Sequence, residues 1–127
     1  MAVMPPAKSL PLPDRVLIHV SPLRRIVVEP SDLYLLEADG DDTIVRKRGR
    51  RTIRDVRPLG ELAAVFSRCG FHRIHDTWCV NLRRVREIRR QRDGRDWEVV
   101  MQPPVNRVLP VSRARLPGLL SRFADKV

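Results

Sequence analysis

The sequence predicts one mostly β domain with a short internal helix and a second helix at its C-terminal end. Short runs of β-branched residues and leucine recur between turn residues, and only one internal segment spaces its apolar residues as a helix does. With 127 residues, 43% of them apolar, the chain is long enough for one domain with a modest core.

Residues 1–14 are expected to form a Pro-rich leader or linker, because proline cannot donate the hydrogen bonds of a strand ladder. Residues 15–127 are then the folded domain. The leader lacks the apolar stretch of a signal peptide, and the chain has no run of about 18 apolar residues. The domain is therefore expected to be cytoplasmic and to make no membrane contact, and a receiver or membrane domain upstream is left open.

The first half of the domain is expected to be a meander followed by a hairpin. Turn residues separate three apolar runs, and an acidic turn at 39–42 leads into a basic hairpin. The predicted strands are Val16–Val20, Arg25–Glu29, Leu33–Glu37, Thr43–Arg48 and Arg51–Arg54.

Residues 57–69 are expected to form the internal helix. Leu59, Leu62, Ala63 and Phe66 follow the i, i+3, i+4, i+7 spacing of one helical face, and Gly70 stands where a C-terminal cap belongs. A third hairpin, a last strand and a final helix are expected after residue 83. Their predicted ranges are Arg84–Arg90, Asp96–Met101 and Val105–Val111, with the helix running from Leu116 to Phe123.

The charge of the chain indicates a polyanionic partner. Lys and Arg number 25 against 15 Asp and Glu, which gives a net charge of +10, and only three of the basic residues are lysines. Arginine binds phosphates and guanine edges through two parallel hydrogen bonds. Codon usage in a GC-rich genome would also favour arginine, but it does not account for the net charge.

No group of residues predicts catalysis, a cofactor or a metal site. The three histidines form no constellation with a nucleophile, and His72, His75 and Cys79 lack a plausible fourth metal ligand. Cys69 and Cys79 do not have CxxC spacing and lie among apolar residues, so both are expected to be buried, reduced thiols.

Two motifs resemble the signature of LytTR-type DNA-binding domains. The first is the run FHRIHDTWCVNL at residues 71–82, and the second is the run LPVSR at residues 109–113. The resemblance covers about residues 16–123. It implies an elongated fold of small antiparallel sheets and a transcriptional regulator that bends duplex DNA at short direct repeats, with loops entering successive grooves.

The resemblance also implies which residues contact DNA. His75 and the adjacent Asp76 would enter the major groove, Thr77 would contact a phosphate, and Arg113 would read a base. Asp76 departs from the family pattern: it would either accept a hydrogen bond from a cytosine or, as we prefer, cap the turn at residues 77–79. Ser112 is expected to cap the final helix.

In the first hairpin, Asp41 and Asp42 occupy a position where the family presents a residue to DNA, which leaves Thr43 as the neutral candidate. The basic residues that follow would supply phosphate anchors, although a solvated hairpin face is the simpler interpretation. Arg46, His75 and Arg113 are the strongest candidates. The full set of expected DNA contacts is Thr43, Arg46, Lys47, Arg48, Arg50, Arg51, Arg73, His75, Asp76, Thr77, Arg113 and Arg115.

Two alternatives stay open at this point. One is a basic RNA- or ribosome-associated β protein, and the other is an interaction module that docks an acidic partner. Direct repeats would suit tandem or dimeric binding, and a partner regulator or an upstream receiver domain could control the module. The sequence does not give the operator or the direction of regulation.

Overall fold

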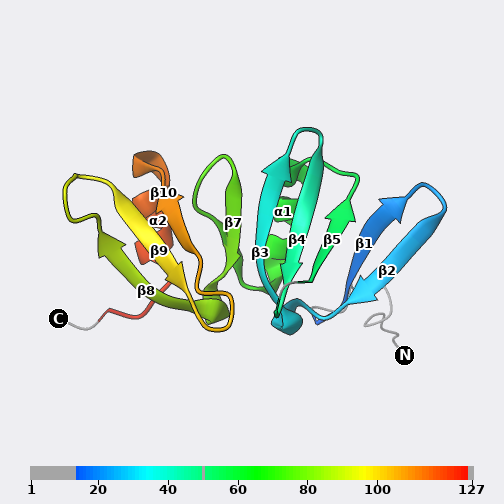
Figure 1. The fold of residues 1–127 in the computed structure, drawn as a ribbon, viewed down its shortest axis with the longest axis horizontal. Coiled ribbons are helices and arrows are strands. Elements are labelled where there is room, and N and C mark those ends of the chain that lie inside the picture. Colours follow the sequence, from blue (N-terminus) through cyan, green and yellow to red (C-terminus); the bar gives the residue numbers. More distant parts are fainter. Residues whose placement is uncertain (1–13, 50, 126–127) are drawn as a thin grey trace, which may run out of the picture.

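The computed structural model describes residues 14–49 and 51–125, and it shows three antiparallel sheets side by side along the long axis of the molecule (Figure 1). The expected leader, apart from Asp14, lies outside the described residues, as does Arg50. The N-terminal sheet pairs β1 (Val16–Ser21) with β2 (Arg24–Val28). The predicted fold, a mostly β domain with an elongated arrangement of small antiparallel sheets, is therefore confirmed.

The central sheet has five strands in the order β5-β4-β3-β7-β6. Its strands are β3 (Leu33–Asp39), β4 (Asp42–Lys47), β5 (Thr52–Asp55), β6 (Phe71–Arg73) and β7 (Trp78–Asn81). The C-terminal sheet has the order β10-β9-β8, built from β8 (Val85–Arg90), β9 (Trp97–Met101) and β10 (Val108–Val111).

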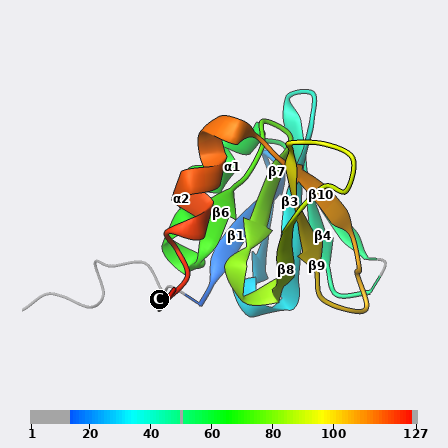
Figure 2. The same cartoon turned by 90° about the vertical axis from the view of Figure 1, so that its left-hand side faces the viewer.

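Both expected helices are present, and Figure 2 shows them on the same side of the molecule. Helix α1 (Leu59–Phe66) continues into a 3-10 turn at Ser67–Cys69, and Gly70 ends it with a φ of 84°, a left-handed conformation that favours glycine. Helix α2 (Leu116–Leu120) is shorter than expected and follows a 3-10 turn, η5 (Arg113–Arg115).

Strand β3 lies between two apolar clusters, so it is buried on both faces. Successive side chains of a strand point to opposite faces. Leu36 joins the cluster under α1 and the N-terminal sheet, whereas Leu35 joins the cluster under α2 and the C-terminal sheet. This double burial explains the continuous apolar run at residues 33–36.

Two details of the sequence prediction were wrong. The run at residues 71–82 holds strands β6 and β7, which were not predicted because strands this short show no clear alternation. The last strand was expected from Val105 but begins at Val108, since residues 103–105 form a turn and Asn106 has a φ of 52°.

Candidate nucleic-acid interface

Three loops meet along one edge of the molecule, which we call the loop edge. It consists of the β3–β4 turn (39–42), the β6–β7 loop (74–77) and residues 112–115, and it lies at the top of Figure 1. The Ala38 N–H donates to the Thr77 carbonyl at 2.8 Å, and the Ser112 N–H donates to the Ile74 carbonyl at 2.8 Å. These two hydrogen bonds fix the β6–β7 loop between its neighbours.

His75 closes the β6–β7 loop with its own side chain. Its Nδ1 accepts from the Thr77 N–H at 3.1 Å, and its carbonyl accepts from the Trp78 N–H at 3.2 Å. A neutral imidazole that accepts at Nδ1 carries its proton on Nε2. The ring is half-buried and therefore offers one fixed N–H donor at the loop edge.

Asp76 does not cap the turn, so the preferred interpretation of this residue was wrong. His75 already supplies the acceptor for the Thr77 N–H, and the Asp76 side chain is 91% exposed. Its Oδ1 lies 3.7 Å from Arg115 Nη2. The carboxylate is thus free of the turn and beside a guanidinium.

Arg73 braces this loop from within. Its Nε donates to the His75 carbonyl at 3.3 Å and its Nη2 to the Asp76 carbonyl at 2.8 Å. The side chain is half-buried. Arg73 therefore supports the loop backbone, and the DNA contact expected of it stays a prediction.

Arg113 is the most exposed arginine of the ion pairs at this edge, with 74% of its side chain accessible. Its Nε donates to Asp96 Oδ1 at 3.1 Å. Ser112 stands at the N-cap of η5, but its hydroxyl makes no capping bond, and its carbonyl accepts from the Arg115 and Leu116 N–H groups. The expectation of a side-chain cap was therefore wrong.

Thr43 is not available as a contact residue, which corrects the expectation for the first hairpin. Its register partner is Asp55, its exposed fraction is 0%, and its hydroxyl donates to the Arg57 carbonyl at 2.8 Å. The side chain that reaches the loop edge from this sheet is Arg54, which bonds Asp39 at 2.6 Å and Asp42 at 3.1 Å. The sequence does not show that Arg54 reaches this edge, because its position depends on ion pairs with residues of other strands.

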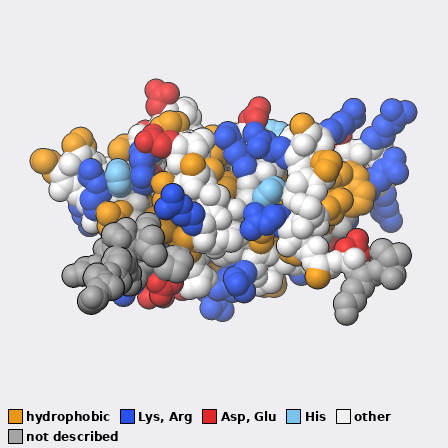
Figure 3. All heavy atoms as spheres, turned by 180° about the vertical axis from the view of Figure 1, so that it is seen from behind, with side chains coloured by type: hydrophobic (Ala, Val, Ile, Leu, Met, Phe, Trp, Pro, Cys, Tyr) orange, Lys and Arg blue, Asp and Glu red, His pale blue; other side chains and the backbone are white. Residues whose placement is uncertain are grey.

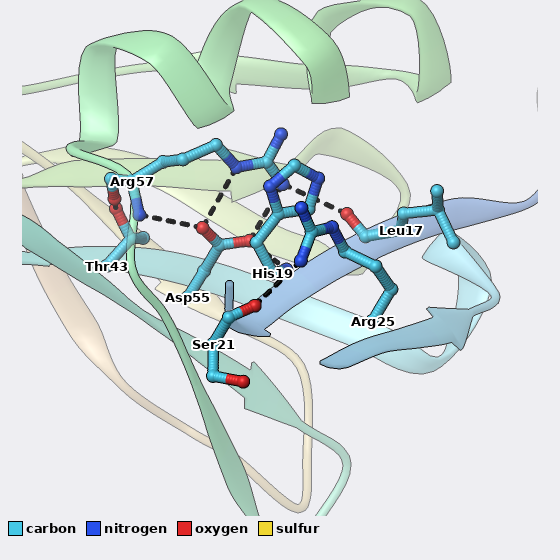
Figure 4. A network of polar contacts seen from close by, with 7 residues as sticks. All are labelled: Leu17, His19, Ser21, Arg25, Thr43, Asp55 and Arg57. Carbon is cyan, nitrogen blue, oxygen red and sulfur yellow. Dashed lines mark hydrogen bonds and ion pairs between the residues drawn. The ribbon is translucent and has the colours of Figure 1, made fainter. Parts of the chain in front are cut away.

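A buried network under the loop edge joins the first two sheets, as Figure 4 shows. The Asp55 carboxylate has an exposed fraction of 0%, and it accepts from the His19 N–H at 2.9 Å and from the Arg57 N–H at 2.8 Å. The Arg57 guanidinium adds two more bonds, at 3.0 and 2.8 Å. Burial opposes ionisation of Asp55, but these hydrogen bonds outweigh it and lower its pKa below the usual value.

The other expected basic anchors lie at the far end of the same strands. We call this the opposite edge: the β4–β5 turn together with the 3-10 turns Pro30–Asp32 and Leu82–Arg84. The Arg48 N–H donates to the Asp32 carbonyl at 3.2 Å and the Lys47 N–H to the Arg51 carbonyl at 2.9 Å. Strand β4 has 6 residues, so this edge lies about 20 Å from the loop edge.

The structure therefore divides the expected contact set into two groups. His75, Asp76, Thr77, Arg113 and Arg115 lie together at the loop edge, whereas the basic residues at 46–51 that the structure describes lie at or toward the opposite edge. Figure 3 shows basic side chains along the upper edge interspersed with acidic ones, and more basic side chains over the C-terminal sheet.

The two cysteines and His72 take structural positions. Cys79 is buried, which raises its pKa to about 12, and burial also raises the pKa of Cys69. Burial and the nearby Arg122 and Arg115 lower the pKa of His72, which packs beside α2.

Within the described ranges, no three potential ligands converge as a metal site, and no helix has the length and apolarity to span a membrane.

The fold and the loop edge define a class of protein: a small mostly β module that presents loops with charged and hydrogen-bonding side chains along one side. Residues 24–124 match the family model of the LytTr DNA-binding domain. The match covers most of the chain, so the protein belongs to the LytTR DNA-binding domain family, which is not a catalytic family. Membership implies DNA binding and, through it, transcriptional regulation.

A solved structure supports the fold. It is the LytTr DNA-binding domain of a Bacillus cereus protein described as a methyl-accepting/DNA response regulator, with a TM-score of 0.67 and 20% sequence identity. The alignment covers 88% of this chain and 98% of that chain. At this identity the likeness establishes the fold alone. A comparison with curated proteins finds no match.

Proposed function

We propose that the loop edge is the surface through which this domain recognises duplex DNA in a sequence-dependent manner. The observation that carries the proposal is the pair of 2.8 Å backbone hydrogen bonds that hold the three loops together. They give the His75 Nε2 donor and the Arg113 guanidinium a common scaffold. Specific recognition needs such fixed groups, because base edges are read by hydrogen bonds of defined geometry.

Each side chain at this edge has a role that its chemistry suits. Arg113 reads a guanine edge, and His75 donates from Nε2 to a base acceptor or a phosphate. Thr77, Arg115 and Arg54 contact the phosphate backbone, with Arg54 replacing Thr43 in the expected set. Asp76 releases Arg115 and accepts from a cytosine amino group.

The arrangement of the loops along one edge suits binding to one side of a duplex. The loops enter successive grooves of a direct-repeat site and bend the DNA, at a cost of about 1–6 kcal/mol that the added contacts offset. Two copies of the chain occupy the two repeats in tandem, and a receiver or partner regulator controls them. The folded unit is residues 15–127, and it acts on chromosomal DNA in the cytoplasm.

The opposite edge makes no direct contact in this proposal. Lys47, Arg48 and Arg51 add to the positive field that attracts DNA, an effect that salt screens over about 10 Å at 0.1 M. Arg46 has its Nε buried with no hydrogen-bond partner among the described residues, so its guanidinium is partly enclosed by the fold.

Selection of bound sites from a pool of randomised duplexes tests the proposal. We expect a paired motif, and we expect Arg113→Ala to lose discrimination at one base pair of it. Side-by-side gel shifts with structured RNA and an acidic peptide address the two alternatives. Tighter binding to either of these than to every duplex would contradict the proposal. Tyr34, Phe66 and Phe71 are buried and the two tryptophans are half-buried, so Phe123 is the one exposed aromatic side chain among the described residues that could stack on single-stranded bases.

A further inference from the structure

We propose that Asp96 is a specificity-determining residue: it orients Arg113 for a guanine edge and penalises binding to DNA of any other sequence. The inference rests on the proposed function of the loop edge. It begins from the ion pair between Asp96 Oδ1 and Arg113 Nε, whose atoms lie 3.1 Å apart. The two residues are 17 positions apart in the sequence, so the contact is made by the fold.

The backbone fixes both partners of this pair. Asp96 ends the β8–β9 loop, where its carbonyl accepts from the Gln91 N–H at 2.8 Å. Val111 pairs with Trp97 in the ladder between β10 and β9, which brings the chain around Asp96 beside the start of η5. The Ser112 N–H bond to Ile74 then ties the same segment to the His75 loop.

The nitrogen of Arg113 that pairs with Asp96 determines which of its N–H groups remain available to bind DNA. A guanidinium has five N–H donors, one on Nε and two on each terminal nitrogen. Asp96 engages Nε, so the two terminal nitrogens remain free to approach guanine O6 and N7 together. A free arginine side chain loses rotamer entropy on binding, and a carboxylate that already holds it lowers that cost.

The same carboxylate acts against non-specific binding. An acidic group near the phosphate backbone repels it, and non-specific affinity comes almost entirely from phosphate contacts. Asp96 therefore lowers affinity for every duplex and recovers affinity only where Arg113 meets its guanine. Arg115 beside Asp76, at 3.7 Å, and Arg54 beside Asp39 and Asp42 repeat this acid–arginine arrangement along the edge.

Asp93 provides a matched control. It lies in the same β8–β9 loop, is exposed, and forms no ion pair with any described residue. Asp93→Ala and Asp96→Ala thus remove the same charge from the same loop, but only the second substitution releases Arg113. Both side chains are exposed, and we expect both variants to keep the thermal midpoint of the original chain.

The experiment measures affinity for a selected duplex and for a scrambled duplex of equal length, at a fixed salt concentration. We expect both variants to bind the scrambled duplex more tightly. The ratio of specific to non-specific affinity should fall by about fivefold or more for Asp96→Ala only, the lower range of a two-bond guanine contact. In an Arg113→Ala background, Asp96→Ala should leave the ratio unchanged.

Several outcomes would overturn the inference. Equal ratios of specific to non-specific affinity for the Asp93 and Asp96 variants would show that Asp96 acts only through its charge. An undiminished Asp96 effect in the Arg113→Ala background would mean that the carboxylate acts on DNA without the arginine. If the original chain selected no motif at all, the proposed function would fail first, and that result is distinct from both of these.

Discussion

The opposite edge is basic, whereas the loop edge carries four carboxylates, Asp39, Asp41, Asp42 and Asp76, among its arginines, and the two edges hold their cations differently. At the loop edge, Arg54, Arg113 and Arg115 each lie beside a carboxylate from another part of the chain. At the opposite edge, Lys47, Arg48 and Arg51 form no ion pair with any residue that the structure describes. Dense positive charge alone thus attracts any polyanion, whereas arginines held by acids favour a partner that offers better acceptors in a defined place.

The loop edge also has an anchor beneath it, and removing that anchor should have the largest effect. Asp55→Ala removes the acceptor of two backbone N–H groups and of two guanidinium bonds from Arg57, which keeps its bond to the Leu17 carbonyl. We expect a loss of about 3 kcal/mol in the free energy of unfolding, the low end for breaking a buried ion pair, since Arg57 keeps some solvent contact. Urea unfolding measures this loss. A decrease of less than about 1 kcal/mol in the free energy of unfolding would contradict the stabilising role of the Asp55 network.

The pH dependence of stability should reveal the same anchor. The pKa of Asp55 is lowered in the folded state, so its stabilising effect is complete above about pH 4 and is lost as the pH falls below the ordinary value of 3.8. The pKa values of His19 and His72 are lowered from 6.5, so their protonation also favours unfolding as the pH drops below that value. Urea midpoints measured from pH 7.5 to 3 test both losses of stability. In Asp55→Asn, the loss of stability below about pH 4 that comes from Asp55 should be absent.

Paired arginine substitutions sharpen the contrast between the edges. Arg113→Ala should cost about 1–3 kcal/mol on the selected duplex and relax preference at one base pair. Arg48→Ala removes an equally charged, exposed side chain from the opposite edge, and it should change both duplexes alike by less than about 0.5 kcal/mol. Fluorescence anisotropy titrations compare the affinities of the two variants. A larger loss of affinity for Arg48→Ala than for Arg113→Ala would place the interface at the opposite edge.

The His75 donor should have a smaller effect that can be separated from the turn. Asparagine places an oxygen near the position of Nδ1, so His75→Asn keeps the bond from the Thr77 N–H and removes only the Nε2 donor. We expect about 1 kcal/mol weaker binding with unchanged stability. His75→Ala should lose stability as well. Unaltered affinity of the asparagine variant would remove His75 from the interface.

Salt dependence should give the smallest effect. Arg115→Ala removes one phosphate contact, and the slope of log affinity against log salt should become shallower by about 0.9. The matched change at the opposite edge, Arg51→Ala, should leave this slope unchanged. A shallower slope for Arg51→Ala would show that DNA also contacts the opposite edge.

Most of the secondary structure could be predicted because apolar spacing and turn residues are local signals. The helix at 59–66 and the hairpins followed from such signals. Strands β6 and β7 did not, since 3 and 4 residues are too few to show a period.

The composition of the candidate site depended on contacts that sequence does not display. Residues 39–42 and residues 48, 49 and 51 are close in the chain, yet one antiparallel strand carries them to opposite ends of a sheet. The burial of Thr43 follows from its register with Asp55 across the sheet. The pairing of Asp96 with Arg113 joins residues from two loops. In each case the decisive neighbour is distant in sequence.

An NMR titration of the labelled domain with a selected duplex shows at once whether DNA binds at the loop edge. If DNA binds at the loop edge, backbone amide shifts change most at residues 39–42, 74–77 and 112–115, with little change at 47–49, 51 and 82–84. Shifts concentrated at the second group, with the first group unmoved, would contradict binding at the loop edge.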